Sequence, residues 1–135
     1  MYYVPLKEGF SEMFKKLILS LCLLSPLSAY AGEGFFLDTP EDAFILAMET
    51  KQDILLIFGA PYCKYCTIMK NDVIKNIQVF DNMLICYVNV EDREDLQKEY
   101  KVSTLPDYMI YRNKVEVKRK VGYTGFDQFK AWLGR

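Results

Sequence analysis

Ala60-Pro61-Tyr62-Cys63-Lys64-Tyr65-Cys66 is the stretch that decides the fold. Its two cysteines are separated by two residues and follow directly after the continuous apolar run of residues 54–58. That run has the length and composition of a central strand buried on both faces, and an amphipathic, helix-like stretch follows the cysteines. The start of a helix offers unpaired backbone N–H groups and a partial positive charge, which favour a thiolate over a thiol. The pattern therefore predicts a redox pair in which Cys63 is a good nucleophile near neutral pH.

The composition indicates one domain of ordinary size with a substantial core. The chain has 135 residues, 51% of them hydrophobic, and a net charge of −1, which argues against disorder. No basic patch of the kind that nucleic-acid binding needs is visible, and we interpret Lys118-Arg119-Lys120 as the solvated face of a strand. Nucleic acid is therefore not an expected partner.

The absence of histidine excludes histidine-based nucleophilic catalysis and histidine-rich metal sites. The four cysteines are Cys22, Cys63, Cys66 and Cys86, and only one pair is close in sequence. A structural zinc site made of two Cys-x-x-Cys pairs cannot form within one chain, although a dimer that shares zinc stays open as an alternative. We expect no metal and no cofactor.

The N-terminal region predicts a secretory signal peptide over residues 13–31. A short basic start precedes an apolar core at residues 17–24, and Ala29-Tyr30-Ala31 gives the small-x-small cleavage pattern. The apolar run is about half of the roughly 20 residues that a membrane span needs, and an uncleaved anchor and a buried helix stay open as alternatives. Gly32 is the expected first mature residue, and residues 1–12 are expected to be an upstream extension.

Export implies an oxidising compartment, which for bacterial signal peptides of this kind is the periplasm. The mature chain of residues 32–135 keeps three cysteines, since Cys22 leaves with the signal. Cys63 and Cys66 form the natural pair. Cys86 lies within an apolar strand, where a buried, inert thiol is the expected state.

Two helices are predicted near the ends of the mature chain. Thr39 is the expected N-cap of the first, with Pro40 at its first helical position. Thr124 is the expected cap of the last. Apolar residues recur at helical spacing on the faces expected to be buried, and they are Ala43, Phe44, Ala47 and Met48 in the first helix and Phe126, Phe129, Trp132 and Leu133 in the last.

Strands alternate with helices in the first part of the mature chain and form a hairpin in the second. Residues 54–58 and 83–90 are predicted as buried strands, each followed by a helix. Residues 108–111 and 115–121 flank a turn and form the predicted hairpin. The order α-β-α-β-α-β-β-α implies an α/β protein with a central mixed sheet of about four strands and helices on both faces.

Four landmarks occur in the order found in a known family. They are Phe58-Gly59-Ala60-Pro61-Tyr62-Cys63-Lys64-Tyr65-Cys66, Val88-Asn89-Val90-Glu91, Tyr100-Lys101-Val102-Ser103-Thr104-Leu105-Pro106 and Val121-Gly122. On these residues the mature chain resembles thioredoxin-fold thiol–disulfide oxidoreductases, and in particular their exported branch with a Pro-x-Cys-x-Tyr-Cys active site. A Cys-x-x-Cys motif alone is a weak signal, whereas a later proline before a hairpin that ends in glycine makes it specific. The resemblance implies the thioredoxin fold.

The same resemblance implies roles for the site residues. Cys63 matches the exposed nucleophile, which attacks a substrate disulfide and forms a mixed disulfide. Cys66 matches the less exposed resolving cysteine, which releases the reduced substrate. Pro106 matches a cis-proline that lies against the pair, and Leu105 would pair its backbone with the bound substrate chain.

Five further positions add to the family pattern or depart from it. Lys64 places a positive charge beside the nucleophile, which favours the thiolate and the reduced form, so we expect a pair more oxidising than cytosolic thioredoxin. Tyr62 and Tyr65 are either an apolar contact rim for substrates or ordinary surface aromatics. Ile57 stands where thioredoxins carry a buried acid, and Tyr87 stands where they carry a buried lysine. The carboxylate that can take the proton of the resolving cysteine is therefore absent, and water or another group must serve.

The favoured function is an exported thiol–disulfide oxidoreductase that reduces disulfides in protein substrates. Such a role needs electrons from a membrane thiol-electron transporter, and we expect the protein to be a monomer. Disulfide isomerase or oxidase activity in the periplasm is the near alternative. A non-catalytic binding module, in which Cys63 and Cys66 form only a structural staple, and a metal chaperone that uses both thiolates are the other classes considered.

Overall fold

The apolar run before the cysteines forms β1 (Asp53–Gly59), which is buried from its second residue to its end. β1 pairs in parallel with β2 (Met83–Asn89) and antiparallel with β3 (Asp107–Arg112). β3 in turn pairs antiparallel with β4 (Val115–Val121) across a tight hairpin. The computed structural model describes residues 36–135, and within them the strands form one sheet in the order β2-β1-β3-β4. The α/β class and the mixed four-stranded sheet are as predicted.

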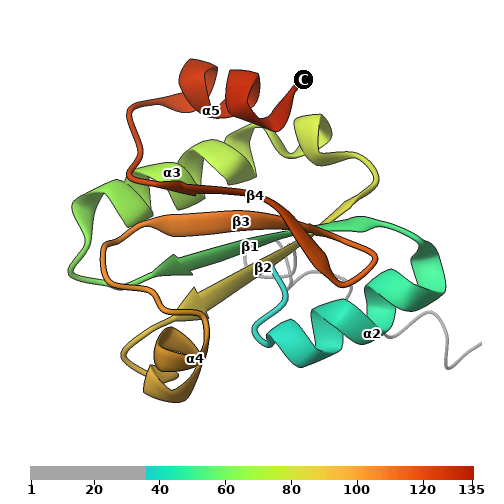
Figure 1. The fold of residues 1–135 in the computed structure, drawn as a ribbon. Helices are drawn as coiled ribbons and strands as arrows, with labels where there is room; N and C mark the ends of the chain where they lie inside the picture. The colour runs from blue at the N-terminus through green and yellow to red at the C-terminus, as the bar shows by residue number, and fades with distance from the viewer. Residues whose placement is uncertain (1–35) are drawn as a thin grey trace, which may run out of the picture. The chain divides into compact units, whose positions relative to one another are not determined.

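Helices cover both faces of this sheet (Figure 1). Two of them lie on one face, α3 and α5, and two lie on the other, α2 and α4. The helical segments of the described chain, in order, are α2 (Pro40–Thr50), α3 (Lys64–Lys75), the 3₁₀ turn η2 (Ile77–Phe80), α4 (Glu94–Glu99) and α5 (Phe126–Leu133).

The alternation of side chains along β1 divides the interior into two cores. Ile54, Leu56 and Phe58 face α2 and α4, and belong to one buried cluster. Leu55 and Ile57 face α3 and α5, and belong to the other. Because both faces are covered, β1 needs apolar residues at every position, which is why its sequence shows no polar alternation.

The start of α2 has the predicted cap. The Thr39 hydroxyl accepts a hydrogen bond from the Asp42 N–H at 3.3 Å, and Pro40 occupies the first turn. The helix ends at Thr50, where Lys51 takes a left-handed conformation with a φ of 61°. The predicted buried face is wrong at Met48, whose side chain is exposed, whereas Ala43 of the same helix is completely buried.

The last helix begins differently from the prediction. Gly125, not Thr124, is the N-cap of α5, and no side chain caps the helix. Gly125 has a φ of 132°, which an L side chain rarely adopts. The buried face of α5 is nevertheless correct, since Phe129 and Leu133 lie in the core against α3.

The predicted signal peptide at residues 13–31, the extension at 1–12 and the expected mature terminus at Gly32 lie outside the described residues. Those three remain predictions. Within residues 36–135, no helix has the length and apolar character needed to cross a membrane.

Candidate active site

Cys63 and Cys66 lie at the junction of β1 and α3 and are joined by a disulfide, with their Cα atoms 5.2 Å apart. A turn after Gly59 places them there, closed by a hydrogen bond of 3.1 Å from the Cys63 N–H to the Ala60 carbonyl. Cys63 is the N-cap of α3, and its sulfur accepts a hydrogen bond of 3.2 Å from the Cys66 N–H. A free backbone N–H at a helix start stabilises negative charge on the atom that it faces. The local geometry therefore favours a thiolate at Cys63 when the pair is reduced.

The two sulfurs differ in their access to solvent. Cys63 is partly exposed, whereas Cys66 is completely buried, at 0% exposure. An incoming disulfide can therefore reach Cys63, and Cys66 can react only with the sulfur of Cys63 beside it. This asymmetry is the arrangement that the sequence predicted for a nucleophile and a resolving cysteine.

The loop before β3 reaches the same end of the sheet. The peptide bond between Leu105 and Pro106 is cis, as expected. Phe58 is paired with Asp107 in the antiparallel register of β1 and β3, so the residues just before Asp107 lie beside the loop that leads from β1 to Cys63. Both Leu105 and Cys63 pack against the same core cluster. The structure therefore brings Leu105 and Pro106 close to the cysteine pair, as the resemblance implied.

An ion pair that sequence reasoning missed anchors this loop. Asp107 is 2% exposed and receives two hydrogen bonds from Arg119 of β4, at 3.0 Å from Nε and 2.6 Å from Nη2. Arg119 also donates to the carbonyls of Tyr100 and Lys101, at 3.0 and 3.4 Å. The signal in the sequence was Asp107, an acidic residue at the start of an otherwise apolar strand. A carboxylate that is buried there needs a partner of opposite charge. Arg119 lies on the exposed face of β4, as the interpretation of residues 118–120 as a solvated strand face implies, but that interpretation did not foresee its bond to Asp107.

Three predicted site residues are exposed around the pair. Tyr62 is 71% exposed and Tyr65 is 57% exposed, so both rings present apolar surface to solvent. Lys64 is the first residue of α3 and is also exposed. Two exposed aromatic rings beside a reactive sulfur can contact an incoming polypeptide, and the alternative of ordinary surface aromatics stays open.

Behind the pair the structure places the two unusual residues side by side. Ile57 of β1 is directly paired with Tyr87 of β2, on the face of the sheet covered by α3 and α5. The ammonium group of Lys70 on α3 lies 4.9 Å from the centre of the Tyr87 ring. Burial raises the pKa of Tyr87, so its phenol is protonated at neutral pH.

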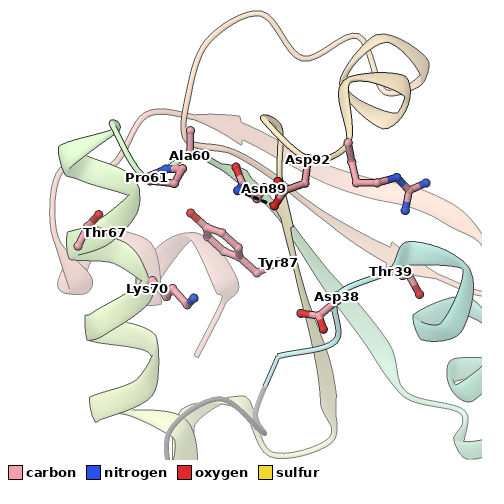
Figure 2. A pocket seen from close by; sticks show the side chains of 10 residues that line it. Asp38, Thr39, Ala60, Pro61, Thr67, Lys70, Tyr87, Asn89 and Asp92 are labelled. Atoms are coloured by element: carbon pink, nitrogen blue, oxygen red, sulfur yellow. Dashed lines mark hydrogen bonds between the residues drawn. The ribbon is translucent and has the colours of Figure 1, made fainter.

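Tyr87 also lines a groove of about 580 Å³ that runs along the outer side of the loop before Cys63. Figure 2 shows Tyr87 rising from β2 with its hydroxyl toward Ala60 and Pro61, and Lys70 reaching in from α3. Two residues further along β2, Asn89 donates a hydrogen bond of 2.8 Å to Asp92. The groove gives solvent a route to the Tyr87 hydroxyl.

Cys86 is not part of the site. It lies in the middle of β2, fully buried, and is not disulfide-bonded. Burial, with a smaller contribution from the carboxylates of Asp38 and Glu41, raises the pKa of its thiol to about 12. Within residues 36–135, no group of three or more cysteine, aspartate or glutamate side chains could hold a metal ion.

The fold and the pair together define a class of protein, the thiol–disulfide oxidoreductases. A cysteine pair at the start of a helix that follows a central strand, with one sulfur accessible and one buried, is built for disulfide exchange. The Thioredoxin family model matches residues 37–135. The chain belongs to the thioredoxin family, and the fold is the thioredoxin fold.

Individual relatives agree with this assignment. The chain is 29% identical over 73 residues to a thioredoxin of Mycoplasma genitalium, covering 54% of this chain and 72% of that protein. It is 30% identical over 81 residues to an H-type thioredoxin of Fagopyrum esculentum, covering 60% and 70%.

Solved structures share the fold at lower identity. A poplar thioredoxin h superposes with a TM-score of 0.65 and 17% identity, covering 73% of this chain and 92% of that one. A thioredoxin-like protein of Edwardsiella tarda gives a TM-score of 0.63 and 21% identity, covering 73% and 97%.

Proposed function

We propose that this protein is an exported thiol–disulfide oxidoreductase that reduces disulfides in protein substrates through Cys63 and Cys66. The observation that carries the proposal is the difference in access between the two sulfurs. Cys63 is partly exposed at the helix start, and Cys66 is completely buried behind it. A purely structural disulfide needs neither an accessible sulfur nor a helix N-terminus aimed at it.

The proposed cycle begins with the reduced pair. The Cys63 thiolate attacks one sulfur of a substrate disulfide, forms a mixed disulfide and releases the other substrate sulfur as a thiolate, which takes a proton from water. Cys66 then loses its proton and attacks the Cys63 sulfur. The bond between Cys63 and Cys66 forms, and the second substrate sulfur leaves as a thiolate. The pair has given two electrons to the substrate and must be reduced again.

The surface around Cys63 supports a polypeptide substrate. Leu105 and Pro106 lie beside the loop that carries Cys63, where the backbone of Leu105 can pair with an extended substrate chain. Tyr62 and Tyr65, each next to one of the two cysteines in sequence, add exposed aromatic surface. Aromatic rings supply large contact areas at a low cost in side-chain entropy, which suits recognition of varied peptides.

Lys64 bears on the redox potential. A positive charge next to Cys63 stabilises its thiolate and therefore the reduced form of the pair. The pair is then more oxidising than cytosolic thioredoxin, which is consistent with work in an oxidising compartment.

The location and the electron source are part of the proposal. The predicted signal peptide at residues 13–31 supports export to the periplasm, where the mature protein acts as a monomer. A membrane thiol-electron transporter supplies the electrons that return the pair to its reduced state. Reduction of insulin without refolding of scrambled ribonuclease would favour this direction, whereas efficient refolding would favour the isomerase alternative.

Substrate trapping tests the proposal. The Cys66→Ser variant cannot resolve, so it should accumulate in the cell as mixed disulfides that a reductant releases, and mass spectrometry would identify the partners. The matched controls are Cys63→Ser/Cys66→Ser, which should trap nothing, and Cys86→Ser, which should behave as the wild type. Trapping that persists without Cys63, or a complete absence of trapped proteins, would contradict the proposal.

A further inference from the structure

Two tyrosines flank Ile57 in neighbouring strands of the sheet, and only one of them has a hydroxyl that is hydrogen-bonded within residues 36–135. Tyr108 on β3 and Tyr87 on β2 are the two register partners of Ile57, on the face covered by α3 and α5. The Tyr108 hydroxyl donates to the Gly122 carbonyl at 2.9 Å. Among residues 36–135, the Tyr87 hydroxyl has no such partner, and no fully buried side-chain oxygen or nitrogen there lacks one. The Tyr87 hydroxyl therefore opens on the groove of Figure 2.

Gly59 shows where that hydroxyl lies. A Cβ atom at Gly59 would overlap the Tyr87 hydroxyl oxygen and would lie 2.7 Å from the Tyr87 Cζ. The same point is 3.1 Å from the Cβ of Cys66. The phenol thus fills the space that a Gly59 side chain would take, in a region that also adjoins the Cβ of Cys66, and glycine is required there because any side chain would displace the phenol.

A hydrogen-bond donor at the position of the Tyr87 hydroxyl would assist the chemistry of Cys66. Its thiol must lose a proton before it can attack Cys63, and complete burial disfavours the charged thiolate. The last three residues of β1, Ile57, Phe58 and Gly59, carry no side chain that can donate a hydrogen bond. A buried thiolate without a donor is strongly destabilised.

We propose that the Tyr87 hydroxyl donates a hydrogen bond to the Cys66 thiolate and thereby promotes the resolving step. This inference rests on the roles proposed above for Cys63 and Cys66. In the mixed disulfide, the buried Cys66 thiol passes its proton to the Tyr87 hydroxyl while that hydroxyl releases its own proton to water in the groove, so Tyr87 stays a neutral phenol and donates to the new thiolate. The Cys66 sulfur then bonds to the Cys63 sulfur, and the substrate sulfur leaves with the electron pair of the broken bond.

The surroundings of Tyr87 suit a donor and not a base. Burial raises its pKa, so the phenol remains protonated. Lys70 lies over the ring at 4.9 Å from its centre, and a cation on the ring face makes the hydroxyl a stronger donor. The other charged groups of the groove are Asp38, Asp92 and Arg93, and Lys64 lies at the start of α3.

A small aromatic disulfide, 5,5′-dithiobis(2-nitrobenzoate), separates the two steps in the reduced full-length protein. Attack by Cys63 releases one coloured thiolate, and resolution by Cys66 releases the second. In Tyr87→Phe we expect the second phase to slow about tenfold at neutral pH, because a hydrogen bond to a charged group is lost. We expect the pH at half-maximal rate of that phase to rise by about one unit. The first phase should stay within about twofold of the wild type.

Tyr108→Phe is the matched control, since it removes a hydroxyl from the same face of the sheet but not from the pair. It should leave both phases unchanged, and denaturant titration of both variants checks that each is folded. An unchanged second phase in Tyr87→Phe, or equal slowing in both variants, would overturn the inference about Tyr87 alone. Two coloured thiolates released by a Cys66→Ser variant would instead overturn the proposed roles of the cysteines.

Discussion

Cys66 and Cys86 are both completely buried, yet their surroundings give them opposite chemistry. Cys66 is the third residue of α3, within bonding distance of Cys63 and next to the phenol of Tyr87. Cys86 lies in mid-strand opposite Leu56, with carboxylates and no cation among its larger influences. Burial disfavours the thiolate and makes a thiol inert, whereas a helix start, a nearby positive charge or a hydrogen-bond donor counteracts that effect.

The Cys86 thiol should make stability fall in alkaline solution. Its folded-state pKa of about 12 exceeds the ordinary value of 9.0, so its contribution is fully present below about pH 9 and is lost as the pH rises toward about 12. The unfolded chain gives up this proton first, which favours unfolding. Denaturant titrations at about pH 8 and about pH 10.5 should therefore show a smaller loss of unfolding free energy in Cys86→Ala than in the wild type.

Tyrosines with raised pKa values titrate in the wild type and in Cys86→Ala alike. Their contribution to the alkaline loss of unfolding free energy therefore cancels when the two proteins are compared. At about pH 8, where the thiol is protonated in both states, Cys86→Ala should lower stability by about 1–2 kcal/mol because it leaves a small cavity, and this difference should shrink as the pH rises. The same alkaline loss in both proteins would show that Cys86 is not the titrating group.

At the scale of single elements, the sequence predicted what continuous or periodic hydrophobicity determines. β1 and the hairpin were predicted within a residue or two, because an apolar run before Gly59 and a turn between apolar segments admit few alternatives. Met48 and Thr124 were placed wrongly, because the depth to which one helix position is buried and the choice of a glycine N-cap depend on how elements meet. The partnership of Asp107 with Arg119 joins two strands and the turn after α4, and no local pattern records it.

That ion pair should stabilise β3, β4 and the Leu105–Pro106 loop together. Arg119→Ala leaves a buried carboxylate at Asp107 and two carbonyls without their donor, so we expect a loss of about 2 kcal/mol in unfolding free energy. Arg112→Ala is the matched control. Arg112 makes a similar two-pronged bond to Asp53, at 2.7 and 3.0 Å, but is well exposed, and its loss should change stability little.

Denaturant titration of the two variants measures the difference. Arg119→Ala should also weaken the reduction of a protein disulfide through a higher KM, since the loop beside Cys63 loses its anchor, while reaction with a small disulfide persists. Equal stability losses in both variants would mean that burial of Asp107 contributes nothing.

At the scale of the whole molecule, the cysteine pair lies at the end of β1, the strand that separates the two buried clusters. β1 carries one core on each face and runs directly into the cysteine loop, so the helix start that activates Cys63 is held by the most buried strand of the described chain. Ile57 and Tyr87 belong to the core and reach the site from behind. The sequence showed which charges were missing there, but only the packing showed that Gly59 admits the Tyr87 phenol.

Because the folded structure holds the start of α3 against Cys63, we predict that reduction of the cysteine pair stabilises the folded protein. The Cys66 N–H, the start of α3 and the charge of Lys64 stabilise a Cys63 thiolate in the folded, reduced state, and a disulfide carries no charge to benefit from them. In the unfolded chain the disulfide closes only a short loop, which restricts the chain little. We expect the reduced protein to be more stable than the oxidised one by about 1 kcal/mol in denaturant titrations near neutral pH.

Lys64→Glu tests the electrostatic origin of that difference, since it replaces the attraction beside Cys63 with repulsion and should narrow the gap between the two redox states. Lys75→Glu, at the other end of α3, is the matched control and should leave the gap unchanged. Folding and redox equilibria form one thermodynamic cycle, so a more stable reduced form is equivalent to a pair that is more oxidising in the folded protein than in the unfolded chain. A more stable oxidised form would therefore refute both the stability prediction and the expected oxidising character of the pair.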